Sequence, residues 1–313
     1  MEKMRFEEFT NAVVEKIREY LPVSFANASV DLQTVTKNND VKLTGLVIRS
    51  GDSNICPTIY LEQFFQNYNN GEEMGDVLAD IADIRLRNEV GNRFDTEQIT
   101  DFAQVRDKIV PRLIGLKWNR ELLEKRPHTI MDDLAVTYHV VLEQDFDGTA
   151  SVPVTNELME AWDTSTATLH ELAIQNMPRL LPSTFQTMSS VIGSLFTEDL
   201  PEGMNAEEAE QIMSEMMPQN ETMFILSNKT KIYGAAAILD REIMETVTER
   251  IGSDFYILPS SVHELLVIPA NAGMDTSTLS DMVKEVNATQ VSPDERLEDH
   301  VYSYDPINGL YSV

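Results

Sequence analysis

Apolar residues recur at steps of three and four near the start of the chain and alternate with polar residues further along. The apolar face of a helix between residues 5 and 20 is formed by Phe6, Phe9, Val13, Ile17 and Tyr20. Pro22 ends this helix, because the residue before a proline avoids helical angles. Alternation then predicts strands at 29–35, 41–48 and 55–61. Since the connections between them are short, we expect an antiparallel three-stranded meander.

Helical spacing returns after the third strand. It predicts helices at 61–68, 74–90 and 96–118, the last one kinked at Pro111. The polar segment Lys125-Arg126-Pro127-His128 separates this helical region from renewed strand patterns. We therefore expect two domains, 1–126 and 127–313, of which the first combines a helix, the meander and a helical bundle.

The second half of the chain contains both helical spacing and the alternation typical of strands. Strands are expected at 134–142, 149–154, 223–227, 231–237, 255–258 and 265–268, and the first two are joined by an Asp-Gly turn. Helices are expected at 155–162, 169–180, 239–251 and 276–286, whereas 185–196 fits either structure. The mixture predicts an α+β fold with antiparallel or mixed sheets and flanking helices.

Composition narrows the function classes. The 313-residue chain is 42% hydrophobic, as globular proteins are, and carries a net charge of −28. Residues 157–313 hold 7 Lys and Arg against 26 Asp and Glu. Such a surface disfavours direct binding to nucleic acid or to anionic membranes. Solubility is its simplest role, and mimicry of the DNA phosphate array is an alternative.

Location follows from what the sequence lacks. The chain has no apolar run of bilayer length and no signal peptide, so we expect neither a membrane partner nor export. The single cysteine, Cys56, leaves no internal disulfide. We expect a cytoplasmic protein.

The segment 197–221 combines acidic residues with methionines. Its members are Glu207, Glu208, Glu210, Met204, Met213, Met216 and Met217, among others. Methionine is flexible and polarizable, so it suits surfaces that bind varied apolar partners. We interpret this segment as a contact for another protein or peptide. An ordinary surface helix and partial disorder are the alternatives.

A second polar group lies between the predicted strands at 255–258 and 265–268. It contains Ser260, Ser261, His263 and Glu264. If the backbone is extended, Ser261 and His263 share a face and Glu264 points away, which is the start of a nucleophile–base pair. The Gly-x-Ser-x-Gly signature of α/β-hydrolases is absent. We favour local hydrogen bonding for these residues, with a hydrolase that uses Ser261 and His263 as the alternative.

Cofactor motifs are missing. His170-Glu171 and His263-Glu264 begin like a zinc-binding His-Glu-x-x-His, but Ile174 and Val267 occupy the closing positions. Glycine-rich loops for dinucleotides or phosphates are absent, and the Asp145-x-Asp147-Gly148 turn does not continue as a calcium loop. We expect no metal and no cofactor.

Several phrases carry a family resemblance. They are Tyr-Gly-Ala-Ala-Ala at 233–237, Phe-Tyr-Ile-Leu-Pro-Ser-Ser-Val-His-Glu at 255–264, Tyr-Ser-Tyr-Asp at 302–305, Lys-Leu-Thr-Gly-Leu at 42–46 and Pro-Thr-Ile-Tyr-Leu at 57–61. Their order resembles an uncharacterised family of gut Firmicutes, domain of unknown function 5688, over most of the chain. The resemblance implies a bacterial accessory protein and transfers no activity and no site residue. Our first functional hypothesis rests on the acidic Met-rich segment and is a non-enzymatic cytosolic protein that recognises another protein or peptide.

Overall fold

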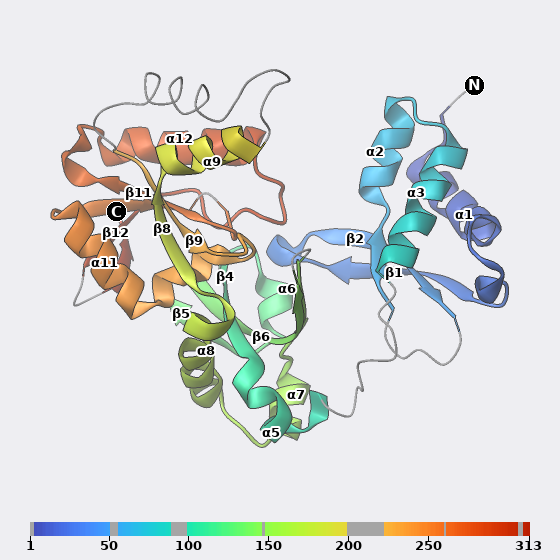
Figure 1. Cartoon of the computed structure of the whole chain (residues 1–313), viewed down its shortest axis with the longest axis horizontal. Helices are drawn as coiled ribbons and strands as arrows, with labels where there is room; N and C mark the ends of the chain where they lie inside the picture. Colours follow the sequence, from blue (N-terminus) through green and yellow to red (C-terminus); the bar gives the residue numbers. More distant parts are fainter. Residues whose placement is uncertain are drawn as a thin grey trace. The chain divides into compact units, whose positions relative to one another are not determined.

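The computed structural model describes residues 3–50, 56–88, 99–145, 148–198, 222–259, 261–305 and 309–313. The chain divides into two compact units, Met1–Asp101 and Phe102–Val313. Figure 1 draws the first in blue to cyan and the second in green to red. All described sheets are antiparallel and have helices beside them, so the expected α+β fold is confirmed.

The first unit is built on the predicted meander. β1 (Ser29–Thr36) pairs with β2 (Lys42–Arg49), and β2 pairs with β3 (Thr58–Tyr60), both antiparallel. Its helices are α1 (Phe6–Lys16), α2 (Glu62–Asn70) and α3 (Met74–Arg87), and its short 3-10 turns are η1 (Ile17–Tyr20), η2 (Val23–Phe25) and η3 (Asn38–Asp40).

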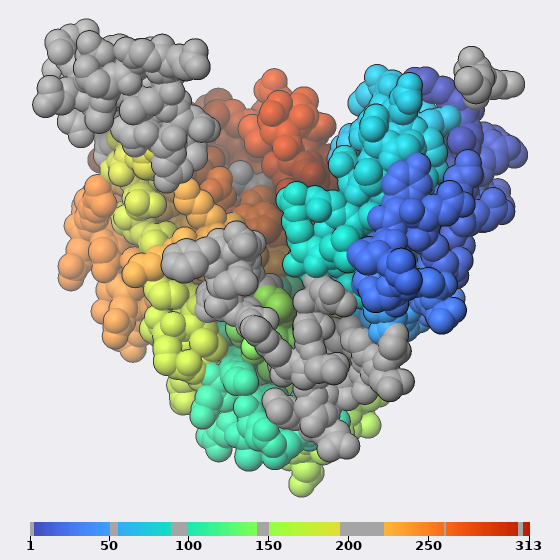
Figure 2. Space-filling view, turned by 45° about the vertical axis from the view of Figure 1, so that its right-hand side comes forward, coloured from blue at the N-terminus to red at the C-terminus, as the bar shows by residue number. Residues whose placement is uncertain are grey.

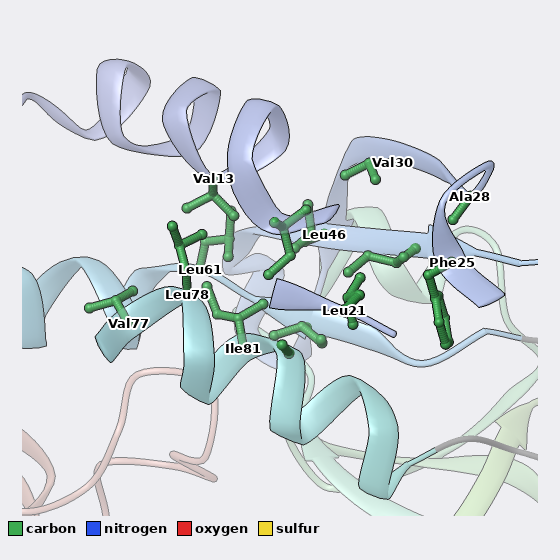
Figure 3. Packing of buried hydrophobic residues seen from close by; sticks show 14 of the residues in the cluster. Val13, Leu21, Phe25, Ala28, Val30, Leu46, Leu61, Val77, Leu78 and Ile81 are labelled. Carbon is green, nitrogen blue, oxygen red and sulfur yellow. The ribbon is translucent and has the colours of Figure 1, made fainter. Parts of the chain in front are cut away.

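The apolar faces of these elements meet in one core. Figure 3 shows Val13 from α1, Leu46 from β2 and Ile81 from α3 pointing toward one another. All three are fully buried, as the helical and strand periods of the sequence predicted. The blue and cyan atoms of this unit form one continuous body in the space-filling view (Figure 2).

The second unit contains a four-stranded sheet. The long β6 (Leu134–Asp145) pairs with β4 (Ile109–Gly115) along one edge. Its other edge pairs first with β5 (His128–Met131) and then with β7 (Gly148–Pro153). The predicted hairpin between β6 and β7 is confirmed by the pairing of Asp145 with Gly148.

A six-stranded sheet completes the second unit. Its order is β13-β12-β10-β11-β9-β8. The strands are β8 (Ser183–Thr187), β9 (Phe224–Asn228), β10 (Phe255–Leu258), β11 (Leu265–Pro269), β12 (Tyr302–Asp305) and β13 (Gly309–Ser312).

Helices pack against this larger sheet. Leu279 and Val283 of α12 form one apolar cluster with Leu258 and Ile268, and α9 and α11 contact β8. The α-helices of the unit are α5 (Phe102–Val105), α6 (Arg120–Leu123), α7 (Asn156–Ala161), α8 (Thr166–Leu180), α9 (Met188–Glu198), α11 (Arg241–Ile251) and α12 (Thr276–Thr289). The 3-10 turns are η4 (Arg106–Lys108), η5 (Gly234–Leu239) and η6 (Ala270–Ala272). In the part of the chain that the structure describes, no helix is both long and apolar enough to cross a bilayer.

Two predicted elements were wrong. The helix expected at 96–118 gives way to β4, whose apolar run pairs with β6 and tolerates Pro111 because β4 is an edge strand. The strand expected at 231–237 is replaced by η5, whose apolar run is buried all round and so has no diagnostic period. The ambiguous segment 185–196 is divided between β8 and α9.

The pairing of β4 with β6 also bears on the domain boundary. It places 102–126 in the same compact unit as the strands that follow. The two units therefore separate after Asp101, earlier than the boundary expected at 126.

Candidate functional site

The polar loop between β10 and β11 forms a local turn. The Ser261 hydroxyl oxygen accepts a hydrogen bond from the backbone N–H of His263 at 3.0 Å, and the Ser261 N–H donates to the carbonyl of Glu264 at 3.3 Å. Ser260 lies outside the described residues. Short polar side chains commonly hold turns in this way.

The His263 imidazole is engaged by other groups. Its Nδ1 accepts the backbone N–H of Tyr233 at 3.1 Å, and its Nε2 lies 3.5 Å from Oε1 of Glu295. Because Nδ1 accepts, the ring proton of the neutral side chain is on Nε2. Among the described residues, no hydrogen bond joins Ser261 Oγ to this ring. The Ser261–His263 hydrolase stays a prediction without a supporting contact.

The acidic Met-rich contact also stays a prediction. Met204, Met213, Met216, Met217 and the segment 207–210 all lie outside the described residues.

The structure brings a basic cluster together where the sequence predicted none. Tyr233 takes a left-handed conformation, with φ 52° and ψ 33°, which is rare for a bulky side chain. The guanidinium carbon of Arg112, on β4, lies 3.5 Å from the centroid of the Tyr233 ring. The same guanidinium donates a hydrogen bond to Oγ of Ser151 on β7 at 2.6 Å. Stacking and hydrogen bonding thus fix the orientation of Arg112.

Further basic groups surround Arg112. Burial lowers the pKa of Arg112 to about 10 and also lowers the pKa of Arg126. The imidazole of His139 on β6 is buried, and burial followed by the charges of Arg112 and Arg126 holds its pKa well below the usual 6.5. Within the described residues, neither arginine forms an ion pair with a carboxylate. We call Arg112, Arg126 and His139 the basic cluster.

A second cluster joins the two sheets of this unit. Asp133, in the turn between β5 and β6, receives a 2.5 Å hydrogen bond on Oδ1 from the hydroxyl of Tyr302 on β12. Its Oδ2 lies 3.2 Å from Nε2 of His300. Nδ1 of His300 lies 4.0 Å from Oε1 of Glu298, whose side chain is only 4% exposed. We call Asp133, Glu298 and His300 the carboxylate–histidine cluster.

The electrostatics of this cluster follow from its burial. Burial, and then the neighbouring Asp133 carboxylate, raise the pKa of Glu298. The pKa of the Tyr302 phenol is raised because the ring is buried and its hydroxyl donates to Asp133. Tyr302 is therefore a neutral hydrogen-bond donor to the cluster.

A cavity of about 540 Å³ adjoins Asp133. Leu116 and Leu123 supply apolar walls, and Lys117, Arg120 and His128 supply basic groups. Its size lies within the usual range for small-ligand sites.

The sequence carries one signal for the basic cluster, which is a local excess of positive charge. Residues 102–126 hold 7 Lys and Arg against 3 Asp and Glu in a chain of net charge −28. The carboxylate–histidine cluster has no such signal, because Asp133 and His300 lie far apart in sequence and meet only through tertiary packing.

Comparison with known proteins agrees with the sequence resemblance. No curated protein and no solved structure matches the chain. A family model does match residues 6–306, which is nearly the whole length. The chain therefore belongs to the family of unknown function DUF5688.

Proposed function

We propose that this protein is a non-enzymatic recognition protein whose second unit binds an anionic group at the basic cluster. The observation that carries the proposal is the pair of partly buried guanidinium groups, Arg112 and Arg126, without a carboxylate partner among the described residues. A buried charge is costly unless it is paired. The chain has 52 Asp and Glu, so carboxylates are abundant, and yet none among the described residues pairs with either guanidinium group.

The ligand chemistry follows from the guanidinium group. Tyr233 covers one face of Arg112 and Ser151 takes one donor, so the remaining N–H groups in the guanidinium plane serve the ligand. Such a planar fork binds the oxygens of a carboxylate or a phosphate. Long-range repulsion from the acidic chain favours a small anion or a peptide terminus over an extended polyanion.

The test is ligand binding to the intact chain and to an Arg126→Gln variant. Isothermal titration with inorganic phosphate, and separately with a short peptide ending in a free carboxylate, identifies the anion. We expect saturable binding of one of them to weaken about tenfold or more in the variant, because a charge-assisted hydrogen bond contributes about 1.5–3 kcal/mol. Amidation of the peptide terminus should abolish its binding if the carboxylate is the recognised group.

Arg241→Gln is the matched control, because Arg241 forms only an exposed ion pair with Glu245 on α11. It should bind like the unaltered protein. Equal affinity in the Arg126 and Arg241 variants, or no saturable binding of either probe, would contradict the proposal.

Three earlier hypotheses remain proposals beside this one. Recognition through the Met-rich segment is tested by changing Met213, Met216 and Met217 to Ser. The hydrolase requires Ser261, and DNA mimicry requires salt-sensitive inhibition of a DNA-binding protein.

The single cysteine among 313 residues supports a cytoplasmic location, where thiols stay reduced.

A further inference from the structure

We propose that the carboxylate–histidine cluster is a binding site for a divalent transition-metal ion. Asp133, Glu298 and His300 each offer one ligand atom, and these three atoms lie within 4.8 Å of one another. A tetrahedral ion with bonds of about 2.0–2.2 Å needs ligand atoms ~3.4 Å apart. The 3.2 Å between Asp133 Oδ2 and His300 Nε2 is already close to that spacing.

The fold holds the three side chains near one another. Asp133 lies in the two-residue turn between β5 and β6, and Glu298 and His300 immediately precede β12. Gly115 permits this approach, because a Cβ atom there would lie only 2.5 Å from the carbonyl oxygen of Leu297. The site is thus built on the ends of strands from both sheets.

Each carboxylate has one oxygen fixed by a protein donor. The Tyr302 hydroxyl donates to Oδ1 of Asp133, and the Asp299 backbone N–H donates to Oε1 of Glu298 at 3.3 Å. Oε2 of Glu298 is left for a ligand, and Oδ2 of Asp133 lies beside Nε2 of His300, the third proposed ligand. Donors that fix the second oxygen are typical of the groups around protein metal sites.

One buried oxygen of the cluster lacks a hydrogen bond among the described residues. It is Oε2 of Glu298, a residue that is only 3% exposed, whereas Nε2 of His300 makes no hydrogen bond but lies 3.2 Å from Oδ2 of Asp133. A buried carboxylate oxygen without a donor destabilises the folded state. A cation bound between Asp133, Glu298 and His300 would neutralise the two carboxylates and give Oε2 of Glu298 a partner.

The ligand types indicate the class of ion. An imidazole with two carboxylates suits Zn²⁺, Mn²⁺ or Fe²⁺, whereas Mg²⁺ and Ca²⁺ prefer oxygen ligands alone. Because Asp133 also lines the cavity of about 540 Å³, a small molecule there would have access to the ion.

The test uses Zn²⁺ as the probe. The full chain is stripped with a chelator and titrated calorimetrically with Zn²⁺, in the presence of excess Mg²⁺ to occupy surface carboxylates. We expect one tight site, accompanied by a rise in the thermal unfolding midpoint. Glu298→Gln and His300→Gln should each weaken it by about 100-fold, and Tyr302→Phe by roughly 10–100-fold, the range seen when a group behind a metal ligand is removed.

Asp132→Asn is the matched control. Asp132 is the neighbouring residue of the same turn, its φ of 55° suits asparagine, and its Oδ2 accepts the backbone N–H of Ser312. It is not one of the three residues whose ligand atoms converge. This variant should bind Zn²⁺ normally. If Glu298→Gln does not fold, the partly exposed His300 decides the question.

A site that persists unchanged in the glutamine variants, or the absence of a tight Zn²⁺ site, would overturn the proposal. The latter result would mean that the three side chains contact one another without holding an ion. Neither result bears on anion binding at the basic cluster, so the two proposals fail separately.

Discussion

The charge and the hydrogen bonds of single residues in the second unit depend more on burial than on the residues next to them in sequence. His139 on β6 is fully enclosed and faces two guanidinium groups, which keeps it neutral. His263, by contrast, accepts a backbone N–H from Tyr233 and so stabilises the start of η5. Histidines that look equivalent in the sequence therefore have different roles, and only the neighbours brought by folding distinguish them.

The neutral state of His139 predicts a pH dependence of stability. Its folded pKa lies below 6.5, so below that pH the unfolded chain binds a proton that the folded chain does not. The contribution of neutral His139 to the free energy of unfolding should be fully present above about pH 6.5 and should decline as the pH falls below it. His139→Gln should flatten the decline of the thermal midpoint, and Arg126→Gln should flatten it in part. Parallel curves for all three proteins would show that His139 does not control this window.

At the scale of elements, η5 is packed so tightly that its first residue has no room for a larger side chain. Residues 234–238 are buried, and Ser227 and His263 lie directly against Gly234. The Ser227 hydroxyl also donates to the carbonyl of His263 at 2.8 Å, which ties β9 to the polar loop. The family phrase Tyr-Gly-Ala-Ala-Ala thus has a packing reason, because larger side chains would not fit.

Gly234→Ala should destabilise the second unit. The new Cβ would lie 2.5 Å from the carbonyl oxygen of His263 and 2.8 Å from the nitrogen of Asn228, and neither backbone atom moves easily. We expect a loss of at least about 2 kcal/mol in the free energy of unfolding, measured by urea denaturation. Gly75→Ala is the control, because only the Tyr20 hydroxyl lies nearby at 3.5 Å. An unchanged transition for Gly234→Ala would refute the packing argument.

At the scale of the whole molecule, charge is the dominant property. Two compact units share a net charge of −28, while the basic residues of 102–126 are gathered in the second unit. Like charges at this density repel one another and oppose the folded state. The basic cluster is a local exception to this sign of charge. We propose that at the basic cluster and at the carboxylate–histidine cluster a ligand of opposite charge offsets the cost of gathering like charges.

Salt should therefore stabilise the protein. Raising NaCl from about 0.02 M to about 0.5 M shortens the screening length several-fold and weakens the repulsion among exposed carboxylates. We expect the thermal midpoint to rise, as measured by differential scanning calorimetry. Repeating the series with Arg126→Gln separates general screening from chloride binding at the basic cluster. A midpoint that falls with salt would mean that attractive ion pairs dominate.

The sequence by itself determined the elements that have a clear period and an end signal. The meander of the first unit was predicted correctly, and so was α11, which begins after the capping Asp240 and ends at Gly252. The mixture of helical and strand periods correctly predicted an α+β fold with antiparallel sheets. These properties are local or additive, so neighbouring residues are enough to fix them.

Tertiary structure decided the rest. β4 is a strand because β6 offers it hydrogen-bond partners, and a short apolar run does not distinguish a strand from a helix on its own. Likewise, the basic cluster and the carboxylate–histidine cluster join residues from separate strands and loops. Their pKa shifts and their contacts among the described residues arise from distance and burial, which a linear sequence does not contain.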